Sequence, residues 1–225
     1  MRIGIIGGTG ALGSGLAMRC AAAGHEVVIG TRDPQRGAEV VADLLGRLDG
    51  RSERASMRAA GNAEAAAFGG IVLVAVRFGN QRETLEAIRD AAQGKIVVDT
   101  TVPLVPPKVM RVQLPAEGSA AQIAQGLLGE GVRVVSAFQS VAAHHLAAMS
   151  DVPCDVLVTG DDRDAREQVI GLAKSMGLNA LHAGPLCNAA AAEALTSVLI
   201  FLNKEYQTHS GIRITGVGGS AELRA

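Results

Sequence analysis

The residues best suited to chemistry in this chain form a glycine-rich turn near its beginning: Gly8, Thr9, Gly10, Ala11, Leu12 and Gly13. The spacing G-x-G-x-x-G, placed after an apolar run and before a helical pattern, is typical of a turn that binds the diphosphate of a dinucleotide. Gly8 permits the tight turn, Gly10 lets the backbone approach the diphosphate, and Gly13 lets the helix pack closely on the strand. Free N–H groups at the start of the helix would bind the diphosphate without a Lys or Arg in the turn.

A second candidate group follows the next apolar run, where a dinucleotide-binding unit meets the ribose of its ligand. An acidic residue there would favour NAD, but this chain has Thr31 and Arg32, with Arg36 one helical turn further on. A hydroxyl and guanidinium groups suit a 2′-phosphate, so the sequence predicts NADP(H). Asp33 is a complication, because a carboxylate turned toward the ribose would repel that phosphate. The alternative is that Arg32 and Asp33 form a solvated turn.

Other reactive residue types do not form a recognisable site. Cys20, Cys154 and Cys187 are odd in number and widely spaced, which predicts neither a disulfide framework nor a zinc site and favours a reducing cytoplasm. His144 and His145 are adjacent, and adjacent residues on a helix point about 100° apart, so we expect no joint metal site. The beginning of the chain also lacks the pattern of a signal peptide.

These residues must be positioned by an alternation of strands and helices that runs through the chain. The Val- and Ile-rich runs predict strands at residues 2–6, 26–29, 71–76, 95–99, 133–137 and 155–159. Helical patterns cover residues 12–23, 35–48, 81–92, 120–128 and 163–176, and a long helix starts at residue 189. The fold class is therefore α/β, a Rossmann-type doubly wound parallel sheet with a smaller C-terminal α/β lobe. We expect a dinucleotide-binding domain over residues 1–137 and the smaller domain, with the second-substrate cleft, over residues 138–225.

Composition narrows the classes of partner. The 225 residues include 21 Lys and Arg against 22 Asp and Glu, so there is no global field to attract nucleic acid or an anionic membrane. With no Trp, one Tyr and four Phe, the chain also lacks aromatic platforms for single-stranded bases. The apolar stretch 189–202 is interrupted by polar residues and is shorter than the roughly 20 residues that a bilayer needs. We expect it to be a buried helix at the contact of a homodimer.

Several short segments after the glycine-rich turn carry a more specific signal. They are Gly24-His25-Glu26, Gly30-Thr31-Arg32, Lys95-Ile96-Val97-Val98, Val134-Val135-Ser136-Ala137, Gly160-Asp161-Asp162, Ala183-Gly184-Pro185-Leu186-Cys187-Asn188 and Glu193-Ala194-Leu195-Thr196. In this order the segments resemble the NADPH-dependent coenzyme F420 reductases, also called F420H2:NADP oxidoreductases. The resemblance runs nearly from end to end.

The resemblance implies reversible hydride transfer between C4 of the nicotinamide of NADP(H) and C5 of the deazaflavin coenzyme F420. The hydride passes directly between the two cofactors, so no catalytic side chain and no metal are implied. Carried over by position, residues 9–12 would line the diphosphate and Thr31, Arg32 and Arg36 the 2′-phosphate. The nicotinamide side would be lined by Val76, Val98 and Ala143. The deazaflavin would be contacted by Phe78, Asn80, Gln139 and Val141.

The chain departs from the family around the second substrate. Arg77 and Phe78 stand where the family has Pro and Trp, and Asn80 and Gln139 stand where it has His. Gln139 could hydrogen-bond a ring carbonyl, Phe78 could cover a flat ring, and Arg77 could meet an anionic deazaflavin. Two alternatives stay open: an NADP-dependent reductase of another small substrate or a flavin, and a non-catalytic NADP(H)-binding redox sensor whose second site has decayed.

Overall fold

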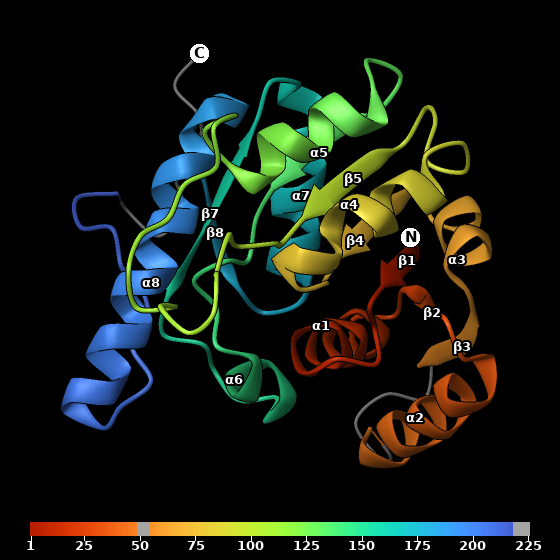
Figure 1. Ribbon diagram of the computed structural model, residues 1–225. Helices are drawn as coiled ribbons and strands as arrows, with labels where there is room; N and C mark the ends of the chain where they lie inside the picture. Colours follow the sequence, from red (N-terminus) through yellow and green to blue (C-terminus); the bar gives the residue numbers. More distant parts are fainter. Residues whose placement is uncertain (49–54, 218–225) are drawn as a thin grey trace.

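The computed structural model describes residues 1–48 and 55–217 and is built around one eight-stranded sheet with the order β3-β2-β1-β4-β5-β6-β7-β8 (Figure 1). Neighbouring strands from β3 to β6 are parallel, β7 is antiparallel to β6, and β8 is parallel to β7. The strands are β1 (Arg2–Ile6), β2 (Glu26–Thr31), β3 (Ser56–Gly61), β4 (Ile71–Val74), β5 (Ile96–Asp99), β6 (Arg133–Ser136), β7 (Asp155–Gly160) and β8 (Asn179–His182). The strand order reverses beside β1, as in a doubly wound Rossmann-type sheet, which confirms the predicted fold class.

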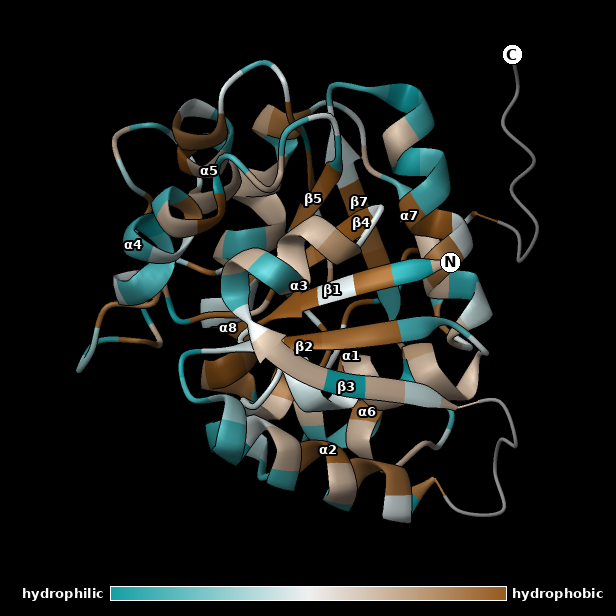
Figure 2. Ribbon diagram, turned by 90° about the vertical axis from the view of Figure 1, so that its right-hand side faces the viewer, coloured by the Kyte–Doolittle hydropathy of each residue, from teal (hydrophilic) through white to brown (hydrophobic). Residues whose placement is uncertain are grey.

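Helices cover both faces of this sheet. They are α1 (Ala11–Ala22), α2 (Pro34–Arg47), α3 (Asn62–Phe68), α4 (Phe78–Ile88), α5 (Ala120–Leu128), α6 (Ala143–Ala147), α7 (Arg163–Ser175) and α8 (Ala189–Tyr206), with the 3-10 turn η1 (Leu186–Asn188) before α8. One hydrophobic core joins the sheet to α1, α2, α6 and α7, and a second core joins it to α3, α4, α5 and the start of α8. Figure 2 shows the hydrophobic residues concentrated in β1, β2, β4 and β5 and hydrophilic residues along α4.

The central strands consist mainly of buried apolar residues because both of their faces are covered. Every residue of β4 and of β5 is buried. In β1, Ile3 and Ile5 belong to the core beside α1, whereas Ile6 belongs to the core beside α3 and α4. Continuous apolar runs are what a parallel sheet between two helix layers requires.

The structure differs from the sequence-based expectations at several boundaries. The strand expected at 71–76 ends at Val74, so Val76 lies in the loop that follows. The helix expected at 81–92 begins at Phe78 and ends at Ile88. The pair β3 and α3 was not predicted, because β3 is an edge strand with only two buried residues and no apolar run. Each of these differences lies at the edge of the sheet or at the end of an element.

The residues after position 137 continue the same sheet. Strands β7 and β8 extend it beyond β6, and Val156 and Val158 belong to the core that also contains Ile3 and Leu16. The segment Leu186–Tyr206 is long and apolar enough to cross a membrane by length and composition. It packs against α5, and its buried Glu193 accepts hydrogen bonds from the first residues of that helix. Helix α8 is therefore packed against the rest of the fold through α5 (Figure 1).

Candidate active site

The glycine-rich turn joins β1 to α1 as predicted. The N–H of Gly10 donates to the carbonyl of Gly7 at 3.0 Å and closes the turn. A Cβ added to Gly13 would lie 2.7 Å from the Cα of Gly8, so close packing requires glycine there. A Cβ added to Gly10 would meet only the carbonyl oxygen of Gly7, at 3.3 Å. The protein itself therefore leaves the outer side of Gly10 open.

The start of α1 is free to bind an anion. No side chain caps this helix and no acidic residue lies in its first turn. In contrast, Asp33, Ser119 and Asp162 each cap the helix that follows them. The uncapped N–H groups and the positive end of the helix dipole are suited to a diphosphate. The residues present thus fit the dinucleotide that the turn predicts.

A cavity of about 630 Å³ lies at this carboxyl edge of the sheet. Residues from the turn, from the end of β2 and from the start of α4 line it, and they include Thr9, Gly10, Thr31, Arg32, Arg36, Val76, Arg77 and Asn80. The structure therefore brings Thr9 and Gly10 of the turn and the predicted 2′-phosphate residues into one cavity, whereas Gly8, Ala11, Leu12 and Gly13 are not among its lining residues. Its size and location are those expected of a ligand site in an open α/β sheet.

The charges around Arg32 resolve the complication at Asp33. The carboxylate of Asp33 accepts the backbone N–H of Arg36 at 3.1 Å and caps α2, so it is engaged with its own helix. Within residues 1–48 and 55–217, neither Arg32 nor Arg36 forms an ion pair. The hydroxyl of Thr31 is bonded within the same turn. Two guanidinium groups thus line the cavity without a protein carboxylate bound to them.

The cavity is also lined by residues that the sequence analysis assigned differently or missed. Asn80, predicted at the deazaflavin, lines the dinucleotide cavity together with Arg77. Asn62 was not predicted, although it also lines this cavity, and its buried Oδ1 has no hydrogen-bond partner among the described residues. Phe78 is the first residue of α4 and is partly buried. Asn62 was missed because it follows the strand β3, which the sequence analysis did not predict.

The burial of Val98 contradicts the prediction that it lines the nicotinamide side. Its side chain is completely buried in the sheet core, between β4 and β6, and has no surface to offer a nicotinamide. Val141 is also buried, at 6% exposure, and its N–H donates to the carbonyl of Phe138. Val98 belongs to the core between the sheet and the helices α1, α6 and α7, and this helix layer explains its burial.

Ala143, predicted on the nicotinamide side, lies beside the glycine-rich turn. It is the first residue of α6 and lines a second cavity, of about 590 Å³, together with Thr9 and Ala11. The buried guanidinium of Arg19 fixes α6 against α1 by donating to the carbonyls of His145 (2.9 Å) and Leu146 (3.1 Å). The turn is thus bordered by the large cavity on one side and by α6 on the other.

Gln139 follows β6 and has a fixed orientation. Its Nε2 donates to the carbonyl of Asp99 at 3.0 Å and to the hydroxyl of Ser136 at 2.7 Å. A carbonyl can only accept, so the amide nitrogen must face it and Oε1 is the atom left for a ligand. Phe138, directly before it, is buried and has a φ of 72°, a conformation that bulky residues seldom adopt. Gln139 is therefore held as an acceptor, not as the donor to a ring carbonyl that the sequence suggested.

Two buried acids, Asp99 and Glu193, were assigned no role by the sequence analysis. Asp99 ends β5, and burial raises the pKa of its carboxyl, against hydrogen bonds from Thr101 and Gln81 that lower it. Burial also raises the pKa of Glu193, on α8, to about 8, although it accepts two backbone hydrogen bonds from α5. Both acids therefore bind a proton more strongly than an exposed carboxylate does.

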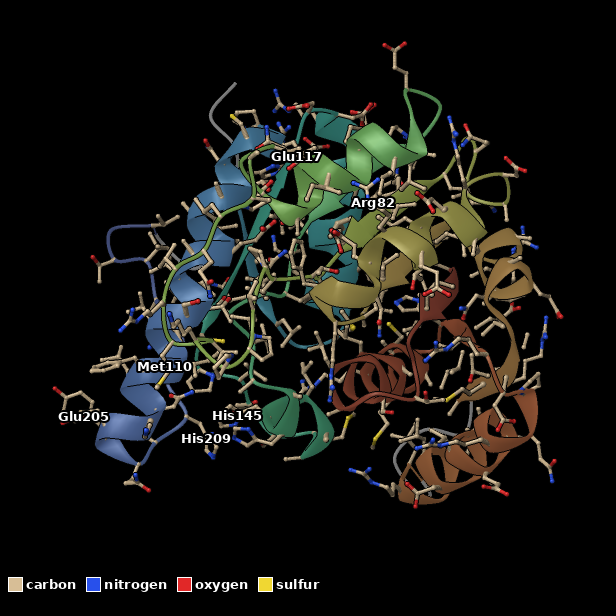
Figure 3. The ribbon with its side chains drawn as sticks, in the orientation of Figure 1. Arg82, Met110, Glu117, His145, Glu205 and His209 are labelled. Atoms are coloured by element: carbon tan, nitrogen blue, oxygen red, sulfur yellow. The ribbon has the colours of Figure 1, made fainter. Side chains whose placement is uncertain are left out.

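Three of the five histidines, His144, His145 and His209, form a cluster. The ring of His144 lies 4.0 Å from that of His145 and 3.7 Å from that of His209, measured between centroids, and Figure 3 shows His145 and His209 near one another. Among the described residues, no group of three or more His, Cys, Asp or Glu side chains is arranged to hold a metal ion.

Comparison with known proteins places these features in one family. Residues 2–103 match the family model described as NADP oxidoreductase coenzyme F420-dependent. The chain is 40% identical over 224 residues to the F420-dependent NADP reductase of Methanothermobacter thermautotrophicus, covering 96% of each chain. It is 36% identical over 223 residues to the F420-dependent NADP reductase of Methanocaldococcus jannaschii, covering 96% of this chain and 99% of that one.

Solved structures of related reductases superpose on this chain. A putative F420-dependent NADP reductase from Arthrobacter sp. FB24 superposes with a TM-score of 0.78 at 26% identity, covering 95% of this chain and 98% of that chain. An imine reductase from Bacillus cereus, at 15% identity and a TM-score of 0.64, covers 92% of this chain but 62% of its own and shares the fold alone. The similarity to the reductases thus includes both the dinucleotide half and the C-terminal lobe.

Proposed function

Because the chain belongs to the family of coenzyme F420-dependent NADP oxidoreductases, we propose that it is an enzyme that transfers a hydride between NADP(H) and coenzyme F420. The observation that carries this proposal is the cavity at the glycine-rich turn, which is lined by the residues before α1 and by two guanidinium groups that form no ion pair within residues 1–48 and 55–217. Full-length similarity to F420-dependent NADP reductases supports the second substrate.

The dinucleotide would be held mainly by backbone and by arginine. The first N–H groups of α1 and the open side of Gly10 would take the diphosphate. Arg32 and Arg36 would take the 2′-phosphate in fork geometry, because Asp33 is engaged in capping α2. Val76, in the loop after β4, and Ala143, at the start of α6, are proposed to border the nicotinamide.

The second substrate is proposed to bind near Phe78 and Gln139. Gln139 would accept a hydrogen bond from a ring N–H, since both hydrogens of its amide are already donated within the protein. Phe78 would cover the flat ring. Asn80, which lines the dinucleotide cavity, is instead suited to contact NADP(H).

When bound, the two cofactors supply the redox chemistry, in which a hydride passes between the nicotinamide and the deazaflavin. This chain's own residues would hold both rings in contact and exclude water. We propose no side chain as a nucleophile or as a general base.

The lobe formed by residues 138–225 would supply the second-substrate wall and a homodimer contact. Val198 and Phe201 of α8 are 42% and 51% exposed, and such apolar side chains suit a contact between subunits. Free cysteines at positions 20, 154 and 187 are consistent with a cytoplasmic location. The net charge of -1 favours small-molecule ligands over nucleic acid or a membrane surface.

The proposed function is tested by mixing the purified protein anaerobically with NADPH and oxidised coenzyme F420 while following the deazaflavin absorbance. We expect F420 to bleach rapidly with NADPH and slowly with NADH. When FMN replaces F420 as the acceptor, we expect no loss of the FMN absorbance. Tight NADPH binding without any bleaching would refute the reductase and favour a sensor. Reduction of FMN instead of F420 would favour the flavin alternative.

A further inference from the structure

Three buried polar side chains meet at the carboxyl edge of the sheet, each from a different element. Gln81 of α4, Asp99 of β5 and Glu193 of α8 are each exposed by 1% or less. We call these three residues the polar cluster. None of them belongs to the motifs that predict dinucleotide binding.

The polar cluster clamps the first peptide of α5 from two sides. The Nε2 of Gln81 donates to the Oδ2 of Asp99 at 2.5 Å and to the carbonyl of Ala120 at 2.9 Å. The N–H of Ala120 donates to Glu193 at 2.7 Å, and the N–H of Ala121 donates to the same carboxyl at 3.1 Å. Through these bonds α4, β5, α5 and α8 are fixed to one another.

The polar cluster also contacts the proposed second-substrate site. The carbonyl of Asp99 accepts from the amide of Gln139, which fixes its orientation. Thr196, less than one turn after Glu193, donates its hydroxyl to the carbonyl of Gln139 at 3.0 Å. Gln81 lies on the first turn of the helix that begins at Phe78. The polar cluster therefore supports both residues proposed to face the deazaflavin.

Stability alone does not account for this arrangement. Burying two carboxyl groups is unfavourable unless their hydrogen bonds compensate, and apolar residues of similar volume often serve stability as well or better. The core around α4 and α5 is otherwise apolar, with Leu85, Ile88 and Ala124 completely buried. Buried polar groups that hydrogen-bond to residues of a proposed ligand site are better explained by their directional hydrogen bonds, which specify one geometry.

Resting on the proposed function, we infer that Gln81, Asp99 and Glu193 are positioning residues that set the separation between the nicotinamide and the deazaflavin. They act on Gln139 through the hydrogen bond that its amide donates to Asp99, and on Phe78 through the helix that it shares with Gln81. Hydride transfer is sensitive to this separation, because a displacement of about 1 Å far from the reacting atoms can lower a rate by about 100-fold.

The chain offers a matched control for this inference. Gln125, at the other end of α5, donates from Nε2 to the carbonyls of Gly129 (2.8 Å) and Val132 (3.0 Å) and accepts from the N–H of Val134. Gln81→Met and Gln125→Met therefore remove the same amide, with comparable hydrogen bonds, near opposite edges of the sheet. Both variants should lose thermal stability.

Only Gln81→Met should alter the reaction. We expect its kcat with NADPH and F420 to fall about 10- to 100-fold, with a larger primary isotope effect from NADPH deuterated at C4 and an unchanged NADPH dissociation constant. Gln125→Met should keep the kcat and isotope effect of the unaltered protein. Hydrogen exchange gives a readout independent of turnover: amides 117–123 should exchange faster in Gln81→Met, and amides 129–134 in Gln125→Met.

Equal kcat and isotope effects in the two variants would overturn the inference, as would unchanged exchange at amides 117–123 in Gln81→Met. If Gln81→Met does not fold, Glu193→Gln replaces it, because Gln can still accept one of the two α5 hydrogen bonds. The same fall in kcat is then expected. Absence of F420 reduction by the unaltered protein would overturn the proposed function itself, which separates the two failures.

Discussion

An added methyl group should have a small effect on the stability of the free protein at Gly10 and a large one at Gly13. In the free protein, a Cβ on Gly10 meets only the Gly7 carbonyl oxygen at 3.3 Å, and the φ of -82° suits alanine. Gly10→Ala should therefore change stability by no more than about 1 kcal/mol, or about 2–4 °C in Tm for a chain of this size. A Cβ on Gly13 lies 2.7 Å from the backbone of Gly8, so Gly13→Ala should cost roughly 1–3 kcal/mol.

Cofactor binding, in contrast to stability, should be strongly affected by Gly10→Ala. The methyl group of Gly10→Ala would stand on the open side of the turn, where the diphosphate approaches the backbone. Loss of one charge-assisted hydrogen bond costs roughly 1.5–3 kcal/mol, so NADPH and NADH should both bind about 10- to 150-fold more weakly. Calorimetric titration with each cofactor, beside thermal unfolding without cofactor, measures both quantities. Retained NADPH affinity in a folded Gly10→Ala protein would refute the role of the turn, and a loss confined to one cofactor would refute the assignment of the diphosphate.

Three further substitutions test other parts of the structure. Arg32→Ala should weaken NADPH binding by about 1–3 kcal/mol and leave NADH nearly unchanged, because only NADPH carries the 2′-phosphate; equal losses would contradict the assignment. Arg19→Met should lower the free energy of unfolding in urea by about 3 kcal/mol or more, because the Arg19 guanidinium donates to the carbonyls of His145, Leu146, Ser150 and Met176; a loss below about 1 kcal/mol would contradict this. Glu193 has a folded pKa of about 8 against an ordinary value of 4.5, so the folded state binds a proton that the unfolded state releases between these pH values. The stability of the unaltered protein should therefore fall as pH rises from 4.5 to 8, and Glu193→Gln should flatten this dependence in unfolding curves; an equal slope in both proteins would contradict the shift.

Local signals were sufficient to predict β1 and α1, on either side of the glycine-rich turn. The strand Arg2–Ile6 has the predicted bounds, and α1 lies within one residue of its predicted position, because an apolar run and a glycine-rich turn specify each element locally. The edge strand Ser56–Gly61 escaped prediction because pairing with β2 determines it. Its sequence has no run of apolar residues, and pairing is a tertiary property that propensity does not contain.

The second half of the site depends on contacts between residues that are remote in the chain. Ala120 and Glu193 are 73 positions apart, and Gln139 and Asp99 are 40 apart. No spacing rule connects such residues, and a buried Gln resembles a surface Gln in sequence. The family resemblance predicts a ligand contact at position 139, but only the structure shows that the Gln139 amide nitrogen already donates to Asp99 and Ser136, which leaves Oε1 as an acceptor.

The hydrogen bonds of the polar cluster also bear on the alternative of a decayed second site. The amide nitrogen of Gln81 donates both of its hydrogens, and the amide nitrogen of Gln139 does the same. An unmatched buried donor costs about 1–3 kcal/mol, so drift at one position would leave its partners unsatisfied. Asp99 accepts from Gln81 through its side chain and from Gln139 through its backbone, and it thereby joins the two amides in one arrangement. Gln139, which stands where the family has His, is thus itself part of an intact hydrogen-bond network, and such a network favours a site with altered contacts over an abandoned one.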